Sequence, residues 1–569
     1  MNKQKIFFKK ANNKSPKNIK NPDYQPSQDY KEKICKNSYL GKKGYTIPKN
    51  ILEKEDEEFL RKDLFVKPVI QGINYGPSTE STAFPVFREN TNKIYIPRFY
   101  GIGRYGIPER SEIKCGDDID VDFTKPLRDY QEKVVDSYVN YVNTKICSGS
   151  IIEDGNNYAA IGSGGIIELY CGAGKTVCAI KIISLLKKKT LIIVHKEFLM
   201  NQWIERIQEF LPSAKVGKIQ GPIFDVDGKD IVIGMVQTLY DKDYAADAFS
   251  SFGLTIIDEV HRIGSEQFSK TLFKTITPCM LGISATVERK DKLTRVLYMF
   301  IGEKIYSLKR DSDECVCVRG IQYISNDPTF NETEVDYRGN TKYSTMITKL
   351  CEFGPRSDFI IRVIKDLISE EADNQIMILC HNRSLLSYLY ESIVFRNIAA
   401  VGFYVGGMKQ NKLQETESKQ IVLATYAMAA EALDIKTLST LVMVTPKTDI
   451  TQSVGRILRM KHENPIIVDI IDSHDVFKKQ WLQRKRFYKK SNYRVWETDS
   501  KKYTNMEVDW KDSSKNGLWK KTFEPSIVNN INNNDIDIDI DINIDIDIDN
   551  VDETPKLSIG KCLLDVSNF

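Results

Sequence analysis

A glycine-rich loop contains the residue types needed to hold a phosphate group. The loop consists of Cys171, Gly172, Ala173, Gly174, Lys175 and Thr176. It follows the apolar stretch 166–170 and precedes an apolar segment with a helical pattern, so its amides and the helix dipole would face an anion. Lys175 would reach the outer phosphates of a nucleotide, and the Thr176 hydroxyl would bind Mg²⁺. Because Leu169 replaces the first glycine of the full G-x-x-x-x-G-K-T pattern, the strand-to-helix setting carries this prediction.

Two carboxylates end a second apolar run, LTIIDEV at 254–260. At the carboxyl end of a buried strand, Asp258 could bind magnesium and Glu259 could polarise an attacking water molecule. A pair of exposed acids after a strand is the ordinary alternative. The acids occur downstream of the loop that contains Lys175, in the tetrapeptide DEVH, and this order favours a magnesium-dependent ATP site.

Two arginines, Arg456 and Arg459, lie three residues apart in the segment QSVGRILR at 452–459. This spacing places them on one face of a helix. They could act across a cleft on the γ-phosphate, a contribution of about 10³ to 10⁵ in rate in related enzymes. A solvated basic helix face is the alternative, and the acids and phosphate loop upstream favour the catalytic interpretation.

The motifs GAGKT, DEVH, SAT at 284–286 and QSVGRILR, in this order, resemble those of the superfamily 2 helicases over about 119–480. The resemblance implies ATP hydrolysis with Mg²⁺ and binding of DNA or RNA. The catalytic residues that it implies are Glu259, Gln452, Arg456 and Arg459. Besides the residues of the phosphate loop, the resemblance implies that Gln131 and Asp434 bind ATP. It implies that ATP state is coupled to strand movement by His261, Ser284, Ala285 and Thr286. The nucleic-acid contacts that it implies are Thr238, Arg289 and Thr425. Ala432 stands where the family usually has glycine, which makes the local turn after Glu431 uncertain.

The residues after SAT and the segments that flank the motifs indicate which branch of the superfamily the chain resembles. Arg289 and Asp291 after SAT resemble a signature of helicases of the xeroderma pigmentosum group B type. The segments 97–108 and 477–495 resemble helicases of large cytoplasmic DNA viruses, including the poxvirus transcript-release helicase. The resemblance therefore implies a protein of a giant virus of amoebae, located in the virion or in the viral factory of the host cytoplasm, with viral transcription machinery as a candidate partner.

Two series of short apolar runs would position these residues. The first includes 190–195, 230–236, 254–260 and 280–286, and the second includes 375–381, 420–426, 440–446 and 465–471. Helical patterns lie between the runs, which predicts an α/β fold with two tandem RecA-like parallel-sheet domains, a small N-terminal module and disordered termini. The expected divisions are a basic disordered N-terminus at 1–54, the module at 55–118, the ATP-binding domain at 119–310, the second domain at 311–480, a basic aromatic extension at 481–525 and an acidic low-complexity tail at 526–569.

Two segments allow more than one interpretation. Gly101, Gly103 and Gly106 form a G-x-G-x-x-G pattern, but Pro97 interrupts the preceding strand, so we expect a glycine-rich turn. The segment 477–495 mixes lysines, arginines and aromatic residues. It could contact phosphates and bases, or it could be a helix that docks its aromatic residues and leaves its lysines in water.

Composition excludes several other classes of protein. The 81 basic and 77 acidic side chains give a formal charge of +4, and the chain contains no apolar run of about 18 residues that would cross a membrane. The 11 cysteines show no zinc-ligand spacing and are expected to be free thiols. The core motifs do not distinguish a DNA substrate from an RNA substrate, and they do not distinguish unwinding of a duplex from translocation along a strand. An inactive nucleic-acid-binding subunit of a transcription complex is a further alternative, against which the intact Lys175, Asp258, Glu259 and arginine pair argue.

Overall fold

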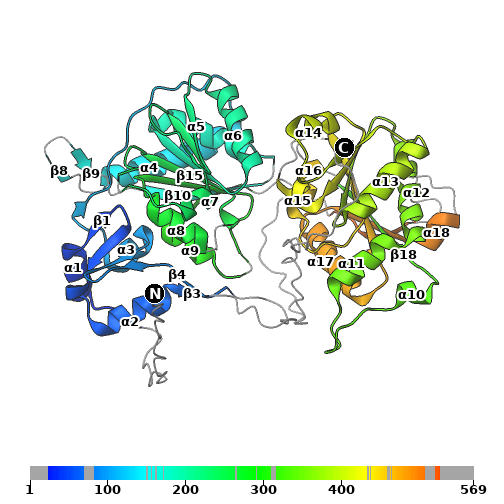
Figure 1. The fold of residues 1–569 in the computed structure, drawn as a ribbon, viewed down its shortest axis with the longest axis horizontal. Helices are drawn as coiled ribbons and strands as arrows, with labels where there is room; N and C mark the ends of the chain where they lie inside the picture. The colour runs from blue at the N-terminus through cyan, green and yellow to red at the C-terminus, as the bar shows by residue number, and fades with distance from the viewer. Residues whose placement is uncertain are drawn as a thin grey trace, which may run out of the picture.

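The computed structural model describes residues 24–68, 83–148, 152–154, 157–159, 163–170, 172–245, 247–262, 266–289, 291–308, 316–431, 435, 437–457, 462, 464–505 and 519–525. Figure 1 shows two α/β units and a smaller N-terminal unit. Each α/β unit is built on an eight-stranded sheet. The predicted fold of two tandem RecA-like parallel-sheet domains is confirmed.

The first large sheet has the order β13-β12-β14-β11-β15-β16-β10-β17. Its strands are β10 (Ser163–Leu169), β11 (Thr190–Val194), β12 (Val216–Gln220), β13 (Ile223–Phe224), β14 (Ile231–Met235), β15 (Leu254–Asp258), β16 (Cys279–Ser284) and β17 (Lys304–Leu308). The pairing is parallel except between β12 and β13. A parallel sheet needs both faces covered, which explains why its central strands are uninterrupted apolar runs.

Helices cover both faces of this sheet (Figure 1). They are α4 (Asp129–Ser148), α5 (Lys175–Leu186), α6 (Glu197–Phe210), α7 (Val236–Asp241), α8 (Glu266–Lys274) and α9 (Thr294–Ile301). The short helix η2 (Val260–Arg262) follows β15, and the hairpin β8 (Ile152–Asp154) and β9 (Asn157–Ala159) follows α4. One apolar cluster lies under α4, α5 and α6, and the other lies under α7, α8 and α9.

The second large sheet has the order β20-β21-β19-β22-β23-β18-β24-β25. Its strands are β18 (Cys317–Tyr323), β19 (Gln375–Cys380), β20 (Val401–Tyr404), β21 (Ile421–Thr425), β22 (Leu438–Met443), β23 (Ile466–Asp472), β24 (Arg494–Asp499) and β25 (Lys520–Phe523). Its helices are α10 (Pro328–Asn331), α11 (Tyr343–Glu352), α12 (Gly354–Glu370), α13 (Arg383–Phe395), α14 (Gln410–Glu417), α15 (Tyr426–Glu431), α16 (Thr451–Ile457), α17 (Asp475–Lys490) and α18 (Ser500–Asn505). Within the expected extension at 481–525, β24 and β25 belong to the second sheet.

In the described residues, the N-terminal module has a five-stranded sheet with the order β5-β6-β2-β1-β7, a two-stranded sheet of β3 and β4, three α-helices and one 3-10 helix. Its elements are α1 (Gln28–Asn37), β1 (Tyr39–Gly41), β2 (Gly44–Pro48), η1 (Lys49–Ile51), α2 (Lys54–Asp63), β3 (Phe65–Val66), β4 (Phe84–Pro85), β5 (Arg88–Glu89), β6 (Lys93–Ile96), α3 (Arg98–Tyr105) and β7 (Arg110–Ser111). The prediction that residues 1–54 are disordered is therefore wrong for residues 28–54. Few apolar residues occur there, but five of them are buried in the module, namely Tyr30, Ile34, Leu40, Tyr45 and Ile47.

The expected glycine-rich turn is a helix. Gly101 and Gly103 lie inside α3, and Gly106, at φ 101°, ends it. A Cβ atom on Gly101 would lie 2.3 Å from Cγ of Tyr45, so glycine lets the helix backbone rest on the tyrosine ring. The glycine at this position serves helix packing, which the sequence pattern alone does not distinguish from a turn.

The module is attached firmly to the first large domain. The helix α3 packs against α9, and the apolar cores of the module and of that face of the sheet are continuous. The buried Arg98 guanidinium donates Nη1 to the carbonyl oxygens of Thr277 at 2.8 Å and Pro278 at 3.3 Å. Arg295 adds an ion pair with Asp63 at 2.8 Å.

No helix in the part of the chain that the structure describes is both long and apolar enough to cross a membrane. Seven cysteines in the described part of the chain are free thiols, namely Cys35, Cys115, Cys178, Cys279, Cys317, Cys351 and Cys380.

Candidate functional site

Three motifs meet because three adjacent strands end at one edge of the first sheet. The strand β16 lies between β10 and β15, and both pairings are parallel. Glu168 of β10 is in register with Ser284, and Asp258 of β15 is in register with Ile283. The phosphate loop after β10, the DEVH segment after β15 and the SAT segment after β16 therefore emerge side by side at the carboxyl edge, where ligands of open α/β sheets bind.

The glycine-rich loop has the backbone geometry of a phosphate cradle. Gly172 and Gly174 have φ angles of 90° and 83°, which favour glycine, and α5 begins at the next residue, Lys175. The helix N-terminus presents free amides and a positive dipole to the space above the loop. These features fit the phosphates of a nucleotide. Cys171 lies outside the described residues.

Two side chains from α4 hold this loop. Tyr130 Oη and Gln131 Nε2 both donate to the Ala173 carbonyl oxygen, at 3.2 and 3.0 Å. The buried Gln131 also accepts the Arg128 amide through Oε1. A Cβ atom on Gly174 would lie 2.3 Å from Gln131 Nε2, so the contact is close. Gln131 therefore positions the loop, and its expected role in binding ATP stays a prediction.

Asp258 is buried and both of its carboxylate oxygens are hydrogen-bonded. The Trp203 indole donates Nε1–H to Oδ2 at 2.9 Å, and the Glu259 amide donates to Oδ1 at 2.9 Å. Burial, and next the charge of Glu259, raise the pKa of Asp258, while the Trp203 hydrogen bond and the Lys175 ammonium act in the opposite direction. The orientation of this carboxylate is thus fixed by the protein.

His261 connects DEVH to SAT. Its Nδ1 atom lies 3.0 Å from Ser284 Oγ and 3.2 Å from Glu259 Oε2. Ser284 donates its hydroxyl proton to the Thr286 carbonyl at 2.5 Å and accepts the Thr286 amide at 3.2 Å. Because the serine proton is committed to this carbonyl, the proton between the two side chains lies on His261 Nδ1. The imidazole therefore joins the glutamate predicted to be catalytic to the segment predicted to sense ATP.

Comparisons with known proteins agree with this geometry. The family described as "Type III restriction enzyme, res subunit" matches residues 124–289. A protein of Acanthamoeba polyphaga mimivirus named "Putative ATP-dependent RNA helicase L396" is 35% identical over 466 residues, which cover 79% of this chain and 85% of that protein. The chain belongs to the superfamily 2 helicases. It is related to helicases of large nucleocytoplasmic DNA viruses.

More distant relatives extend the comparison. "Putative ATP-dependent RNA helicase QP509L" of African swine fever virus is 28% identical over 433 residues, covering 70% of this helicase and 81% of the relative. The "DNA 3'-5' translocase XPB2" of Sulfurisphaera tokodaii is 38% identical over 144 residues, 25% of this chain and 31% of that protein. The solved helicase domain of Pyrococcus furiosus Hef has a TM-score of 0.43 and 13% identity, and the match covers 63% of this chain and 98% of that one.

The expected nucleic-acid residues of the first domain have other contacts in this helicase. Thr238 Oγ1 accepts the Gly221 amide at 3.0 Å, and Thr238 is half-buried. The Arg289 guanidinium donates to Asp291 and to the His261 carbonyl oxygen. Arg289 thus ties the DEVH segment to the SAT segment, while a role for either residue in nucleic-acid binding stays a prediction.

The second-domain residues are only partly described. Thr425 is the last residue of β21, at the carboxyl edge of the second sheet. Gln452 and Arg456 lie in α16, where the backbone is described and these side chains are not. Asp434 and Arg459 lie outside the described residues. The structure therefore brings together the predicted site residues of the first domain and leaves the arginine pair as a prediction.

Sequence reasoning missed two residues of this site. Trp203 holds Asp258, and Glu168 holds the loop after β16 by accepting the Val287 amide at 2.8 Å. Neither residue belongs to a recognised motif in the sequence, since each acts through a hydrogen bond to a segment far away along the chain.

The basic segment 477–495 lies largely on the helix α17. Its Trp481, Arg484 and Tyr488 are buried, and Arg484 forms a two-pronged ion pair with Asp469 at 2.7 and 2.8 Å. These three residues therefore agree with the interpretation in which the helix docks its aromatic residues on the protein. The exposed lysines of the helix are Lys478, Lys479, Lys489 and Lys490.

Proposed function

We propose that this helicase couples ATP hydrolysis to unwinding of, or translocation along, a strand of DNA or RNA. The observation that carries the proposal is the meeting of the phosphate loop, DEVH and SAT at three adjacent strand ends. The relatives named as ATP-dependent helicases support it.

Each group has a role in the proposed mechanism. Lys175 and the amides at the start of α5 would bind the β- and γ-phosphates, and Thr176 and Asp258 would hold Mg²⁺. The metal ion supplies positive charge that offsets the charge of the phosphates. Glu259 orients the attacking water molecule. Arg456, Arg459 and Gln452 would complete the site from the second domain, with Asp434 among the residues that bind ATP.

The network around His261 would couple chemistry to movement. Its Nδ1–H contacts both Glu259 and Ser284, so a displacement of the glutamate is passed to the SAT loop, which includes Ala285 and Thr286. Contacts of Thr238, Thr425 and Arg289 with the nucleic-acid backbone would make the grip independent of sequence. We place this activity in viral transcription or genome maintenance, in the virion or the viral factory.

The first experiment is Lys175→Ala. We expect ATP turnover to be abolished and nucleic-acid binding to be nearly unchanged, because the removed ammonium contacts only phosphates of the nucleotide. Lys187→Ala is the matched control, since Lys187 follows the same helix and pairs with the exposed Asp120 at 3.1 Å. Substantial remaining ATPase activity in Lys175→Ala would contradict the assignment of the loop.

The second experiment distinguishes the alternatives. ATPase activity is measured alone, with single-stranded DNA and with single-stranded RNA, and strand displacement is measured on a duplex of the stimulating polymer. Stimulation by one polymer identifies the track, and stimulation without displacement identifies a translocase. Binding without any ATPase activity would instead identify an inactive nucleic-acid-binding subunit and contradict the proposal.

A further inference from the structure

The N-terminal sheet carries a row of polar and aromatic side chains across all five strands. The register pairs Arg88 with Tyr95, Tyr95 with Thr46, Thr46 with Tyr39, and Tyr39 with Arg110. Directly paired residues of adjacent strands share one face of a sheet. These residues therefore line a single face, which we call the tyrosine face.

The two tyrosines of this face are surrounded by cations. Lys43 Nζ lies 5.2 Å from the centre of the Tyr95 ring. Lys93 Nζ and Arg110 Cζ lie 5.1 and 4.9 Å from the centre of the Tyr39 ring. Aromatic rings with cations beside them are the combination that binds single-stranded nucleic acid, because bases stack on the rings and the cations pair with phosphates.

The opposite face of the sheet is already occupied. Leu40, Tyr45 and Ile96 are fully buried there, and Gly101 brings α3 against the Tyr45 ring. Since α3 in turn packs on α9, the first domain lies on the side of the opposite face. At one end of the tyrosine face, the Arg88 guanidinium lies 5.6 Å from the centre of the Phe273 ring of the first domain. Tyr39 and Tyr95 are half-buried, and Arg110 is exposed.

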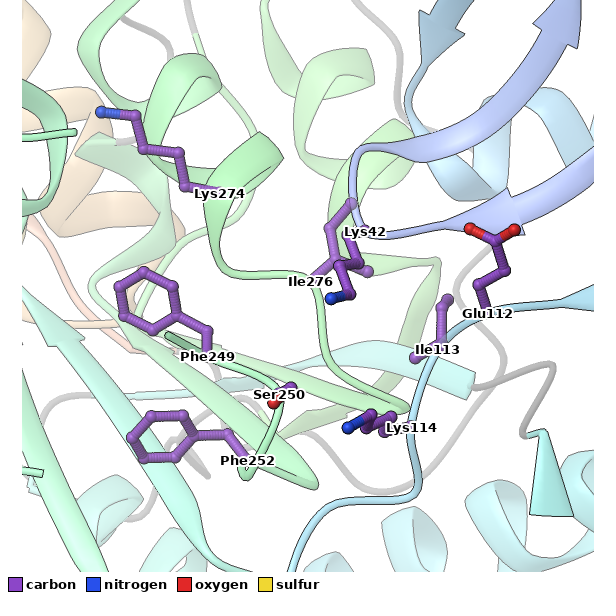
Figure 2. A pocket seen from close by; sticks show the side chains of 9 residues that line it. All are labelled: Lys42, Glu112, Ile113, Lys114, Phe249, Ser250, Phe252, Lys274 and Ile276. Carbon is purple, nitrogen blue, oxygen red and sulfur yellow. The ribbon is translucent and has the colours of Figure 1, made fainter. Parts of the chain in front are cut away.

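A pocket lies where the module meets the first domain (Figure 2). It is lined by Lys42, Glu112, Ile113, Lys114, Phe249, Ser250, Phe252, Lys274 and Ile276. Lys42 is the neighbour of Lys43 in the turn between β1 and β2, and Glu112 pairs with Arg110, so two residues that line the pocket adjoin the tyrosine face.

Two lysines of the pocket are available to an anion. Figure 2 shows the Lys42 and Lys114 ammonium groups pointing into the space that Ser250 borders, while Lys274 points away. Lys274 instead donates to the carbonyl oxygens of Leu239, Tyr240 and Lys242. Among the described residues, neither Lys42 nor Lys114 forms an ion pair.

This surface is distinct from the ATP site. Phe252 and Ile276 precede β15 and β16, so the pocket lies at the amino edge of the first sheet. Asp258 and the phosphate loop lie at the carboxyl edge of the same sheet. Changes at the pocket can therefore alter binding of a strand without touching the groups that hydrolyse ATP.

We propose that the tyrosine face and the adjoining pocket form a second binding surface for a single strand of nucleic acid. Unpaired bases take the place of Lys43 over the Tyr95 ring and of Lys93 or Arg110 over the Tyr39 ring. Phosphates contact the displaced cations together with Lys42 and Lys114. The exposed cations beside both rings favour a polyanion with flat apolar bases as the occupant. The proposal rests on the nucleic-acid binding proposed above and adds a contact outside the two motor domains.

The test uses the full-length protein and fluorescent oligonucleotides of about 20 nucleotides, longer than the roughly 4–16 nucleotides that an OB-fold covers. For Lys42→Ala with Lys114→Ala, we expect the slope of log K against log salt to fall by about 1.4 with single strands, or about 0.7 for each lost phosphate contact. For Tyr39→Ser with Tyr95→Ser, we expect affinity to fall about five- to a hundredfold for each base that loses its ring. ATPase activity without nucleic acid should be unchanged in both variants.

Two further variants keep the test decisive. Lys43→Gln with Arg110→Gln changes only exposed side chains, so it preserves the fold if the tyrosine variants do not. Lys33→Ala with Lys54→Ala is the control, because it removes the same charge from exposed positions on α1 and α2 of the same module and should leave the affinity unchanged. Photocrosslinking of an iodouracil oligonucleotide should label Tyr39 or Tyr95.

The outcomes separate this inference from the proposed function. If the unchanged protein binds no oligonucleotide, the proposed function fails. If it binds and the face variants bind equally well, the second surface is refuted and the motor function stands. An equal loss of affinity for a blunt duplex would refute stacking of unpaired bases. A change in oligomeric state without a change in oligonucleotide binding would assign the face to a second copy of the chain and overturn the proposal.

Discussion

Replacing Trp203 by Phe removes one hydrogen-bond donor from Asp258 and keeps much of the aromatic bulk. The Trp203 side chain is buried, and its indole Nε1 lies 2.9 Å from Asp258 Oδ2. A hydrogen bond to a charged group contributes about 1.5–3 kcal/mol. We expect this free energy to be lost partly from the stability of the first domain and partly from the binding of Mg²⁺, because the carboxylate loses the contact that orients it.

Two measurements follow this free energy. Urea unfolding measures the loss in stability of the first domain, and ATPase activity as a function of Mg²⁺ concentration measures the loss in free energy of Mg²⁺ binding. The two losses should sum to about 1.5–3 kcal/mol. If the whole effect falls on the metal, the Mg²⁺ concentration for half-maximal activity rises about ten- to a hundredfold. Nucleic-acid binding without nucleotide should be retained, because the buried Trp203 contacts Asp258 of the proposed ATP site.

Two controls separate the hydrogen bond from loss of packing. In Trp496→Phe the removed N–H is buried and has no hydrogen-bond partner among the described residues, so we expect little change in stability. In an Asp258→Asn background the charge is absent, so Trp203→Phe should cost less than in the unchanged protein, and the difference gives the coupling free energy. Equal costs in the two backgrounds would refute the role assigned to Trp203.

Two other expected outcomes concern α17 and His261. Arg484→Met should lower the free energy of unfolding of the second domain by about 3–5 kcal/mol, because Asp469 stays buried without its partner. The control Arg486→Met replaces an exposed side chain and should have little effect. Thermal unfolding measures both variants, and equal shifts would contradict the structural role of Arg484. His261→Ala should reduce stimulation of ATPase activity by nucleic acid several-fold and spare the unstimulated rate more, since it removes the contact between Glu259 and Ser284. Undiminished stimulation would show that coupling does not pass through this histidine.

The sequence predicts, for a physical reason, that the phosphate loop, DEVH and SAT lie side by side. Apolar runs identify buried parallel strands, and parallel strands place their carboxyl ends together. The relation between Lys175, Asp258 and Ser284 therefore follows from the order of the strands. Trp203 could not be predicted in the same way, because its contact depends on how a helix rotates over the sheet.

Composition misleads at the N-terminus. Lysine and asparagine surround the few apolar residues of 28–54, so average hydropathy is low, yet Ile34, Leu40 and Ile47 are completely buried. Burial of a small number of well-placed side chains is enough when a neighbouring domain extends the core. The glycine pattern at Gly101 misleads for a related reason, since close packing on a ring and a tight turn both require the absence of a side chain.

The continuous core of the module and the first domain also bears on how the chain folds. Because Arg98 inserts into the first domain and the apolar cluster crosses the boundary without interruption, the module and that domain form one cooperative folding unit. A fragment that begins near residue 119 would expose the apolar surface of α9 to water and to aggregation. The division near residue 118 marks a change of architecture along the chain, and the unit that folds and unfolds together extends across it.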